Sequence, residues 1–139
     1  MDATAEANVQ TVMSLYAAFE KGDVEGMLVA LDPAIDWEFY GPNTIPLAGR
    51  YHGHDEVLRF IGMIGDSLDI QNFSPDVAVV ASGDGVAVTG KESGLARPTG
   101  RPFESHFVHM FTLRGGKIVA AREYYDTAAL VTAFTGAGD

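Results

Sequence analysis

Residues 103–125, FESHFVHMFTLRGGKIVAAREYY, have the pattern of two β-strands joined by a tight turn. Apolar and polar side chains alternate along residues 103–113, and this period of two is typical of a strand with one buried face. The Gly115-Gly116 pair favours a hairpin turn. The more apolar face of the first strand should lie against the rest of the fold, and it carries Phe103, Ser105, Phe107, His109, Phe111 and Leu113.

Helical patterns dominate the chain before this hairpin. Apolar residues three and four apart predict helices over residues 4–20, 24–31 and 55–65. Between them, alternation predicts a strand at 35–39, and glycine and proline predict a loop at 41–53. The remaining expected elements are strands at 73–81 and 86–96 and a short helix at 127–134. Three N-terminal helices packed on a curved antiparallel or mixed sheet make an α+β roll, and we expect residues 1–139 to form one such domain.

Charge and composition restrict the partners that the chain can bind. Nineteen Asp and Glu against nine Lys and Arg give a net charge of −10, which repels nucleic acid and anionic membranes. A neutral or cationic small molecule, or a second copy of the chain, is the easier partner. The sequence has no cysteine, and its start lacks the basic and apolar run of a secretion signal. These features favour a cytoplasmic location.

Several short motifs, taken in order, resemble the SnoaL-like branch of the nuclear-transport-factor-like superfamily, which also contains ketosteroid isomerase. The motifs are Tyr16-Ala17-Ala18-Phe19 with Gly22-Asp23, Leu31-Asp32-Pro33-Ala34-Ile35-Asp36-Trp37, Gly49-Arg50-Tyr51 with Gly53, His109 with Phe111, Gly116-Lys117-Ile118, and Arg122-Glu123-Tyr124. This resemblance implies a cone-shaped roll with one apolar pocket between the sheet and the helices.

The resemblance does not select a reaction, because the superfamily includes isomerases, polyketide cyclases, epoxide hydrolases, dehydratases and transport adaptors. It also implies a homodimer formed through the open face of the sheet. The side chains expected to point outward on that face are apolar enough to support such contact; they are Val108, Met110, Ile118 and Tyr124.

The ketosteroid isomerase mechanism fits this sequence poorly. That chemistry uses an Asp base together with a Tyr and a protonated Asp that donate to an oxyanion. By the resemblance, Phe39 occupies the position of the base, and His109 occupies the position of the donor Asp. Tyr16 falls about one residue from the position of the catalytic Tyr. We therefore disfavour isomerisation by that mechanism.

His109 and Glu123 are the candidate catalytic residues. His109 lies on the inward face among aromatic residues, where it is either a general acid or base or a core histidine with one hydrogen bond. The orientation of Glu123 depends on the turn. A three-residue turn Arg114–Gly116 puts Glu123 inside, whereas a two-residue turn puts Arg122 and Tyr124 inside. The resemblance favours Glu123, which could fix the tautomer of His109 or act as a second acid–base group; otherwise it is an exposed salt-bridge partner.

The expected walls of the pocket are aromatic and apolar. In this fold the core lines the pocket, so the same residues serve both. The predicted lining residues are Tyr16, Trp37, Phe39, Phe60, Met63, Phe107, Phe111 and Tyr125. Tyr51 lies in the predicted loop, where it is a lid, a partner surface or simply exposed.

Neither a metal nor a cofactor is expected. The pairs His52/His54 and His106/His109 have ligand-like spacing, but the second pair should point to opposite faces of one strand. The glycines lack the following Lys-Ser/Thr of a phosphate-binding loop.

Two hypotheses follow for the function. The first is a small-molecule-binding protein, with an acid–base enzyme activity of isomerase, cyclase or hydrolase type on a compact apolar substrate. The second is a non-catalytic assembly domain that forms homodimers through its open sheet face. An open cavity with His109 at its base favours the first hypothesis, and a filled core favours the second.

Overall fold

The computed structural model describes residues 3–76 and 80–136, and within these the chain forms four helices and a seven-stranded sheet. In chain order the elements are α1 (Ala3–Lys21), α2 (Val24–Ala30), β1 (Leu31–Phe39), β2 (Gly49–His52), α3 (Gly53–Ser67), β3 (Leu68–Pro75), β4 (Val80–Ser82), β5 (Gly85–Ala96), β6 (Arg101–Arg114), β7 (Lys117–Tyr125) and α4 (Thr127–Thr135). In the described parts of the chain, no helix is long and apolar enough to cross a membrane.

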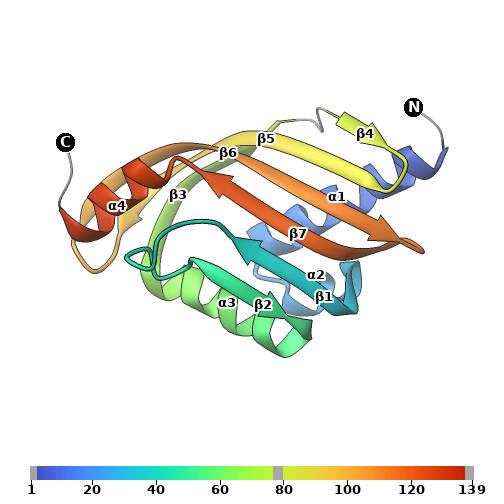
Figure 1. Ribbon diagram of the computed structural model, residues 1–139, viewed down its shortest axis with the longest axis horizontal. Coiled ribbons are helices and arrows are strands. Elements are labelled where there is room, and N and C mark those ends of the chain that lie inside the picture. Colours follow the sequence, from blue (N-terminus) through green and yellow to red (C-terminus); the bar gives the residue numbers. More distant parts are fainter. Residues whose placement is uncertain (1–2, 77–79, 137–139) are drawn as a thin grey trace.

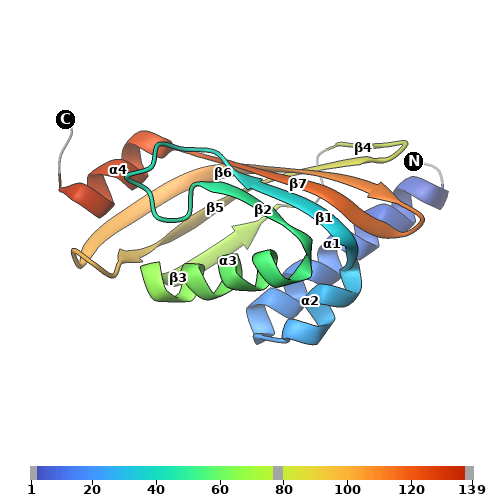
Figure 2. The same cartoon turned by 60° about the horizontal axis from the view of Figure 1, so that its bottom comes forward.

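The sheet is mixed and strongly curved. Its strand order is β2-β1-β7-β6-β5-β3, and β4 pairs with β5 beside this path. The β1–β7 pair is parallel, and all other pairs are antiparallel. The helices α1, α2 and α3 lie under one face of the sheet, and α4 follows β7 at one end (Figures 1 and 2). The predicted α+β roll, three N-terminal helices on a curved mixed sheet, is confirmed.

Some boundaries differ from those predicted. Helix α2 ends at Ala30, and Pro33 lies inside β1 rather than at a helix end. The β1–β7 register shifts between Leu31 and Asp36, so the missing N–H of Pro33 falls where the ladder is already interrupted. The loop predicted at 41–53 contains β2. The strand predicted at 73–81 is two strands, β3 and β4, and the link at 77–79 lies outside the described residues.

The alternation predicted for β6 is confirmed. From Phe103 to Leu113 every second side chain is buried, and the intervening side chains are exposed. The buried set faces α1, α2 and α3, because these helices cover only that side of the sheet (Figure 2). His109 belongs to the buried set, with 4% of its surface exposed.

The hairpin between β6 and β7 has the two-residue turn, but the residue that points inward is the one expected for the three-residue turn. Arg114 pairs with Lys117, so the turn has two residues, Gly115 and Gly116, with φ of 58° and 79°. A two-residue turn alone would point Arg122 inward. However, the register shifts between Thr112 and Leu113, which leaves β7 with one extra residue, a β-bulge. The bulge reverses the alternation, and Glu123 is the residue that points inward, with 7% of its surface exposed.

The curl of the sheet depends on close backbone contact between β3 and β5. Gly94 on β5 faces inward, and a Cβ atom at this position would overlap the carbonyl oxygen of Asp69 on β3. A Cβ atom at Gly90 would likewise overlap the ring of Phe107. The absence of side chains at these two positions lets β3 lie close against its neighbour β5 on the concave face of the sheet.

A substitution at Gly94 tests this account. Gly94→Ala should lower the free energy of unfolding by about 1–3 kcal/mol, because the backbone of β3 must move to admit a methyl group. Gly62→Ala is the matched control: Gly62 lies in α3 with open space around it, and alanine should raise stability there by about 0.5–1 kcal/mol. Urea unfolding measures both changes. Equal effects of the two variants would contradict the proposed contact.

Candidate functional site

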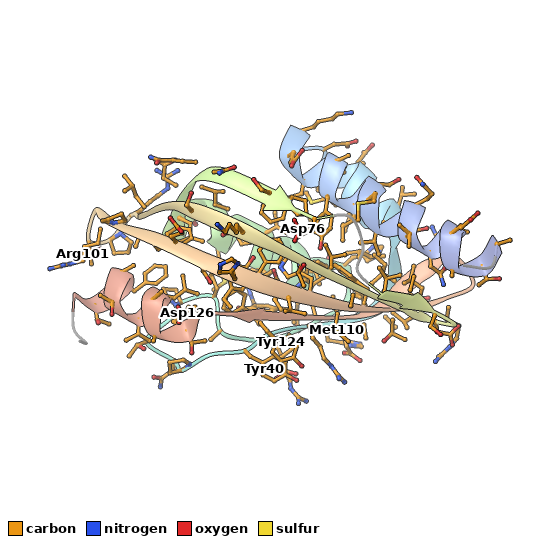
Figure 3. The ribbon with its side chains drawn as sticks, turned by 90° about the horizontal axis from the view of Figure 1, so that it is seen from above. Tyr40, Asp76, Arg101, Met110, Tyr124 and Asp126 are labelled. Carbon is orange, nitrogen blue, oxygen red and sulfur yellow. The ribbon has the colours of Figure 1, made fainter. Side chains whose placement is uncertain are left out.

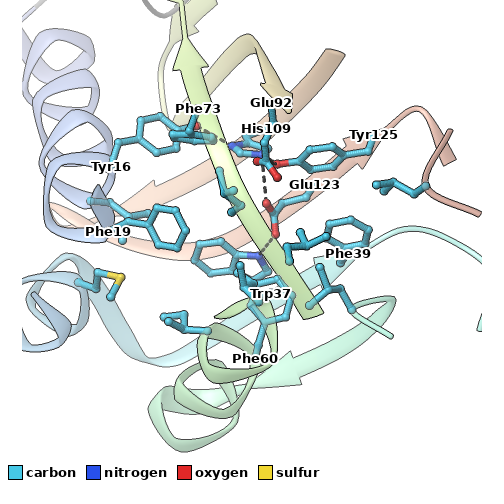
Figure 4. Close-up of a pocket in the computed structure, with 18 of the residues that line it drawn as sticks. Tyr16, Phe19, Trp37, Phe39, Phe60, Phe73, Glu92, His109, Glu123 and Tyr125 are labelled. Carbon is cyan, nitrogen blue, oxygen red and sulfur yellow. Dashed lines mark hydrogen bonds and ion pairs between the residues drawn. The ribbon is translucent and has the colours of Figure 1, made fainter. Parts of the chain in front are cut away.

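An aromatic cavity lies between the concave face of the sheet and the helices (Figure 4). The space open to the centre of a water molecule is about 60 Å³. The wall is almost wholly apolar apart from His109, two carboxylates and two tyrosine hydroxyls. Its residues are Leu15, Tyr16, Phe19, Met27, Leu31, Trp37, Phe39, Leu47, Phe60, Ile61, Ile64, Leu68, Ile70, Phe73, Glu92, His109, Glu123, Tyr125 and Leu130.

His109 is the centre of the polar groups in this wall. Its Nδ1 lies 2.8 Å from the hydroxyl of Tyr16 on α1. Its Nε2 lies 3.0 Å from Oε1 of Glu123 and 3.1 Å from the hydroxyl of Tyr125 on β7. The ring of Phe107 stacks on the imidazole with a centroid separation of 4.2 Å. Both nitrogens therefore have partners, and packing fixes the plane of the ring.

Glu123 is held by two donors from different strands. It lies directly opposite His109 in the β6–β7 register, and its Oε2 accepts a hydrogen bond of 2.8 Å from the indole Nε1 of Trp37 on β1. A carboxylate with both oxygens engaged can only accept, so the neutral imidazole carries its proton on Nε2. Its Nδ1 then accepts from the Tyr16 hydroxyl.

A second buried carboxylate, Glu92 on β5, was missed by the sequence analysis. It is 6% exposed, and its Oε1 accepts a hydrogen bond of 2.9 Å from the Tyr125 hydroxyl. The hydroxyl of Tyr125 thereby joins Glu92 to His109 (Figure 4). One signal was available in the sequence: Glu92 lies on the same face of its strand as Val86 and Val88. An acidic residue on the same face as buried valines is unusual.

Burial changes the proton affinity of these groups. The pKa of Glu92 is raised to about 7, chiefly by desolvation; the hydrogen bond from Tyr125 opposes this rise, and the charge of Glu123 adds to it. Burial, followed by the nearby carboxylate charges, also raises the pKa of Tyr16 and of Tyr125. The two tyrosines therefore remain neutral donors at ordinary pH, whereas Glu92 is poised to exchange a proton near neutrality.

Seven of the ten predicted site residues line the cavity, namely His109, Glu123, Tyr16, Trp37, Phe39, Phe60 and Tyr125. The other three, Met63, Phe107 and Phe111, are not among the residues that line the cavity. Met63 packs against the core, outside the arc of α3 that reaches the cavity. Phe107 lies behind the imidazole of His109, covered by Phe73 at a centroid separation of 5.3 Å. Phe111 is buried edge-on to His109.

Two further expectations are corrected. Tyr51 is neither a lid nor exposed: it lies in β2, 5% exposed, with its hydroxyl donating to the Leu47 carbonyl over 2.8 Å. Ile118, expected on the outer face, is fully buried because it precedes the β-bulge.

The remaining three histidines do not line the cavity. His52 Nδ1 lies 2.6 Å from Asp36 on the surface, and His54 Nε2 lies 3.0 Å from the Leu31 carbonyl. His106 is exposed on the outer face, opposite to His109. Within the described residues, no three His, Asp or Glu side chains gather in an arrangement that could hold a metal ion.

The pKa of Glu92 predicts a pH-dependent stability. Because this pKa rises from its ordinary value of 4.5 to about 7 on folding, the folded state holds the proton more tightly. Stability should therefore be full below pH 4.5 and fall as the pH rises through 7, by about 3 kcal/mol at 1.36 kcal/mol per unit. Urea unfolding of the wild type and Glu92→Gln from pH 5 to pH 8 isolates this contribution; parallel curves would contradict it.

Comparison with known proteins assigns the family. Residues 12–121 match the SnoaL-like domain family. No protein of curated function matches the chain. Among solved structures, an NTF2-like protein from Burkholderia xenovorans LB400 is 33% identical, with 94% of this chain and 97% of that chain covered and a TM-score of 0.85.

Two other solved structures are also similar. TerC, co-crystallised with polyporic acid, is 26% identical, with 92% of this chain and 98% of that chain covered and a TM-score of 0.73. A proposed SnoaL-like polyketide cyclase from Jannaschia sp. CCS1 is 18% identical, with 99% and 98% covered and a TM-score of 0.78, which shows the shared fold alone. The chain thus belongs to the SnoaL-like domain family, within the NTF2-like fold.

Proposed function

We propose that this protein binds a compact, mostly apolar small molecule in its cavity and acts on it by acid–base chemistry without a cofactor. One observation carries the proposal: a continuous chain of hydrogen bonds runs along an otherwise apolar wall. It extends from Tyr16 through His109 to Glu123 and Trp37, and branches through Tyr125 to Glu92. The co-crystal of TerC with polyporic acid supports the binding of a small molecule in a relative.

The geometry around His109 suits proton transfer. In the neutral imidazole, Nδ1 is the atom with a lone pair, and the Tyr16 hydroxyl donates to it. A substrate proton can reach Nδ1 through this hydroxyl, which gives up its own proton as it takes the new one. The imidazolium that forms lies 3.0 Å from Glu123, whose negative charge stabilises it. The reaction class is therefore proton removal and return, as in isomerisation or cyclisation.

Replacement of His109 tests this proposal. A thermal-shift screen against aromatic carbonyl compounds, steroids, polyketide-like aromatics and epoxides should identify a stabilising ligand. His109→Ala should abolish that stabilisation. His106→Ala is the matched control, because His106 lies on the same strand and points to the opposite face. Equal ligand responses of the two variants would refute a role for His109.

If His109→Ala fails to fold, the less disruptive substitution Tyr16→Phe tests the same proposal. Tyr16→Phe removes one hydroxyl and keeps the ring, so it should cost only about 1 kcal/mol of stability. Turnover of a substrate found in the screen should fall by about a hundredfold, the low end of what one general acid or base contributes. Unchanged turnover would exclude proton transfer through Tyr16.

Assembly is the second candidate function, because the outer face of the sheet exposes apolar side chains. Val108, Met110 and Tyr124 are 36%, 45% and 40% exposed. Tyr40 stacks on Tyr124 with a centroid separation of 4.7 Å, and Figure 3 shows Met110, Tyr124 and Tyr40 on this part of the molecule. We propose that a second copy of the chain covers this face.

A charge on this face tests the dimer. Met110→Lys should convert the wild-type dimer to a monomer in sedimentation experiments, since the lysine would be buried against an apolar surface. Val29→Lys is the matched control, because Val29 is 66% exposed on α2, away from this face. A wild-type monomer at high concentration would rule out this candidate function.

A further inference from the structure

The hydrogen-bond donors in the cavity wall are all used within the protein. With the proton of His109 on Nε2, the side chains of the wall offer four donors, and each has an acceptor. Tyr16 donates to His109, and His109 donates to Glu123. Tyr125 donates to Glu92, and Trp37 donates to Glu123. A ligand that brings only acceptors, such as a carboxylate, therefore finds no free donor when Glu92 is ionised.

One strong acceptor stays open. Glu92 Oε1 accepts from Tyr125, but Oε2 forms no hydrogen bond with any described residue. Among these residues no fully buried side-chain oxygen lacks a partner, so Oε2 keeps some accessible surface, and Glu92 lines the cavity. An open carboxylate oxygen at an apolar wall needs a donor, and a charged donor gives the stronger hydrogen bond.

The charge of the wall points to a cation. The wall contains two carboxylates and one imidazole, and no lysine or arginine. Glu123 is matched by His109 and Trp37, whereas Glu92 meets only the neutral hydroxyl of Tyr125. The rings of Tyr16, Phe19, Trp37, Phe60 and Phe73 surround the space, and aromatic faces attract cations.

We propose that the cavity selects a protonated amine on a compact apolar body, and that the amine donates to Glu92 Oε2. The inference rests on the proposed function, because it uses the same cavity and names the polar end of the molecule that enters it. Glu92 then determines specificity, while His109 and Glu123 remain the acid–base pair. Because burial raises the pKa of Glu92 to about 7, a bound cation also favours release of the proton from the Glu92 carboxyl group.

Three compounds of one shape test the charge preference. Benzylamine, benzyl alcohol and benzoate differ chiefly in the group that would meet Glu92, and calorimetry at pH 8 measures their affinities for the wild type. Benzylamine should bind about ten- to a hundredfold more tightly than benzyl alcohol, and benzoate should bind most weakly. Glu92→Gln should remove this preference. Glu104→Gln, the same change of charge on the exposed outer face, should leave all three affinities as they are.

The outcomes separate this inference from the proposed function. Binding without preference for the amine, or a preference that survives in Glu92→Gln, overturns the inference and leaves the cavity as a ligand site. If no compound binds, and none from the broader screen does, both proposals fail.

The pH dependence of benzylamine binding gives a test that does not need Glu92→Gln to fold. Affinity should rise from pH 6 to pH 8 as Glu92 ionises; the titratable groups that face it are Tyr125, Glu123, His109 and Tyr16. Tyr125→Phe removes the hydrogen bond that lowers the pKa of Glu92, so the midpoint should move to higher pH. A midpoint that stays in place or moves to lower pH would overturn the inference.

Discussion

Glu123 places a carboxylate in the interior of an aromatic cone, where only 7% of its surface is exposed. An unpaired charge in such a place costs several kcal/mol, so the fold must supply donors. It does so from two directions: Trp37 donates from β1 and His109 from β6, the strands on either side of β7. Tyr16 then ties the imidazole to α1. The need to satisfy one carboxylate therefore fixes the positions of three strands and a helix.

The same network supplies the chemistry. Its members satisfy one another without a ligand, so the polar groups stabilise the folded chain and remain in position for proton transfer. The cavity beside them is lined almost wholly by apolar side chains.

The sequence predicted side-chain orientation best where the pattern within a single strand determines it. The alternation along β6 placed His109 and its neighbours correctly, because a strand with one buried face admits a single period. The inward position of Glu123 depends on a β-bulge, and bulges arise from the pairing of two strands that neither sequence encodes alone.

Glu92 was missed for a related reason. Gly90 and Gly94 flank it on the same face of β5, and their lack of side chains hides the hydrophobic period. Alternation also places Phe107 and Phe111 inside without revealing that Phe73 and His109 cover them. Inward orientation follows from the sequence, but access to the cavity depends on which neighbours pack in between.

The parallel pairing of β1 with β7 has a consequence for how the protein is made. Trp37 and Glu123 are 86 positions apart, and their hydrogen bond spans most of the chain. During synthesis β1 emerges from the ribosome long before its partner strand β7. Until then the β1 edge has no β7 to pair with, and the chain cannot close its cavity. Such long-range pairing slows folding, so the nascent protein depends on its local elements, α1 to α3, to keep β1 out of wrong pairings until β7 arrives.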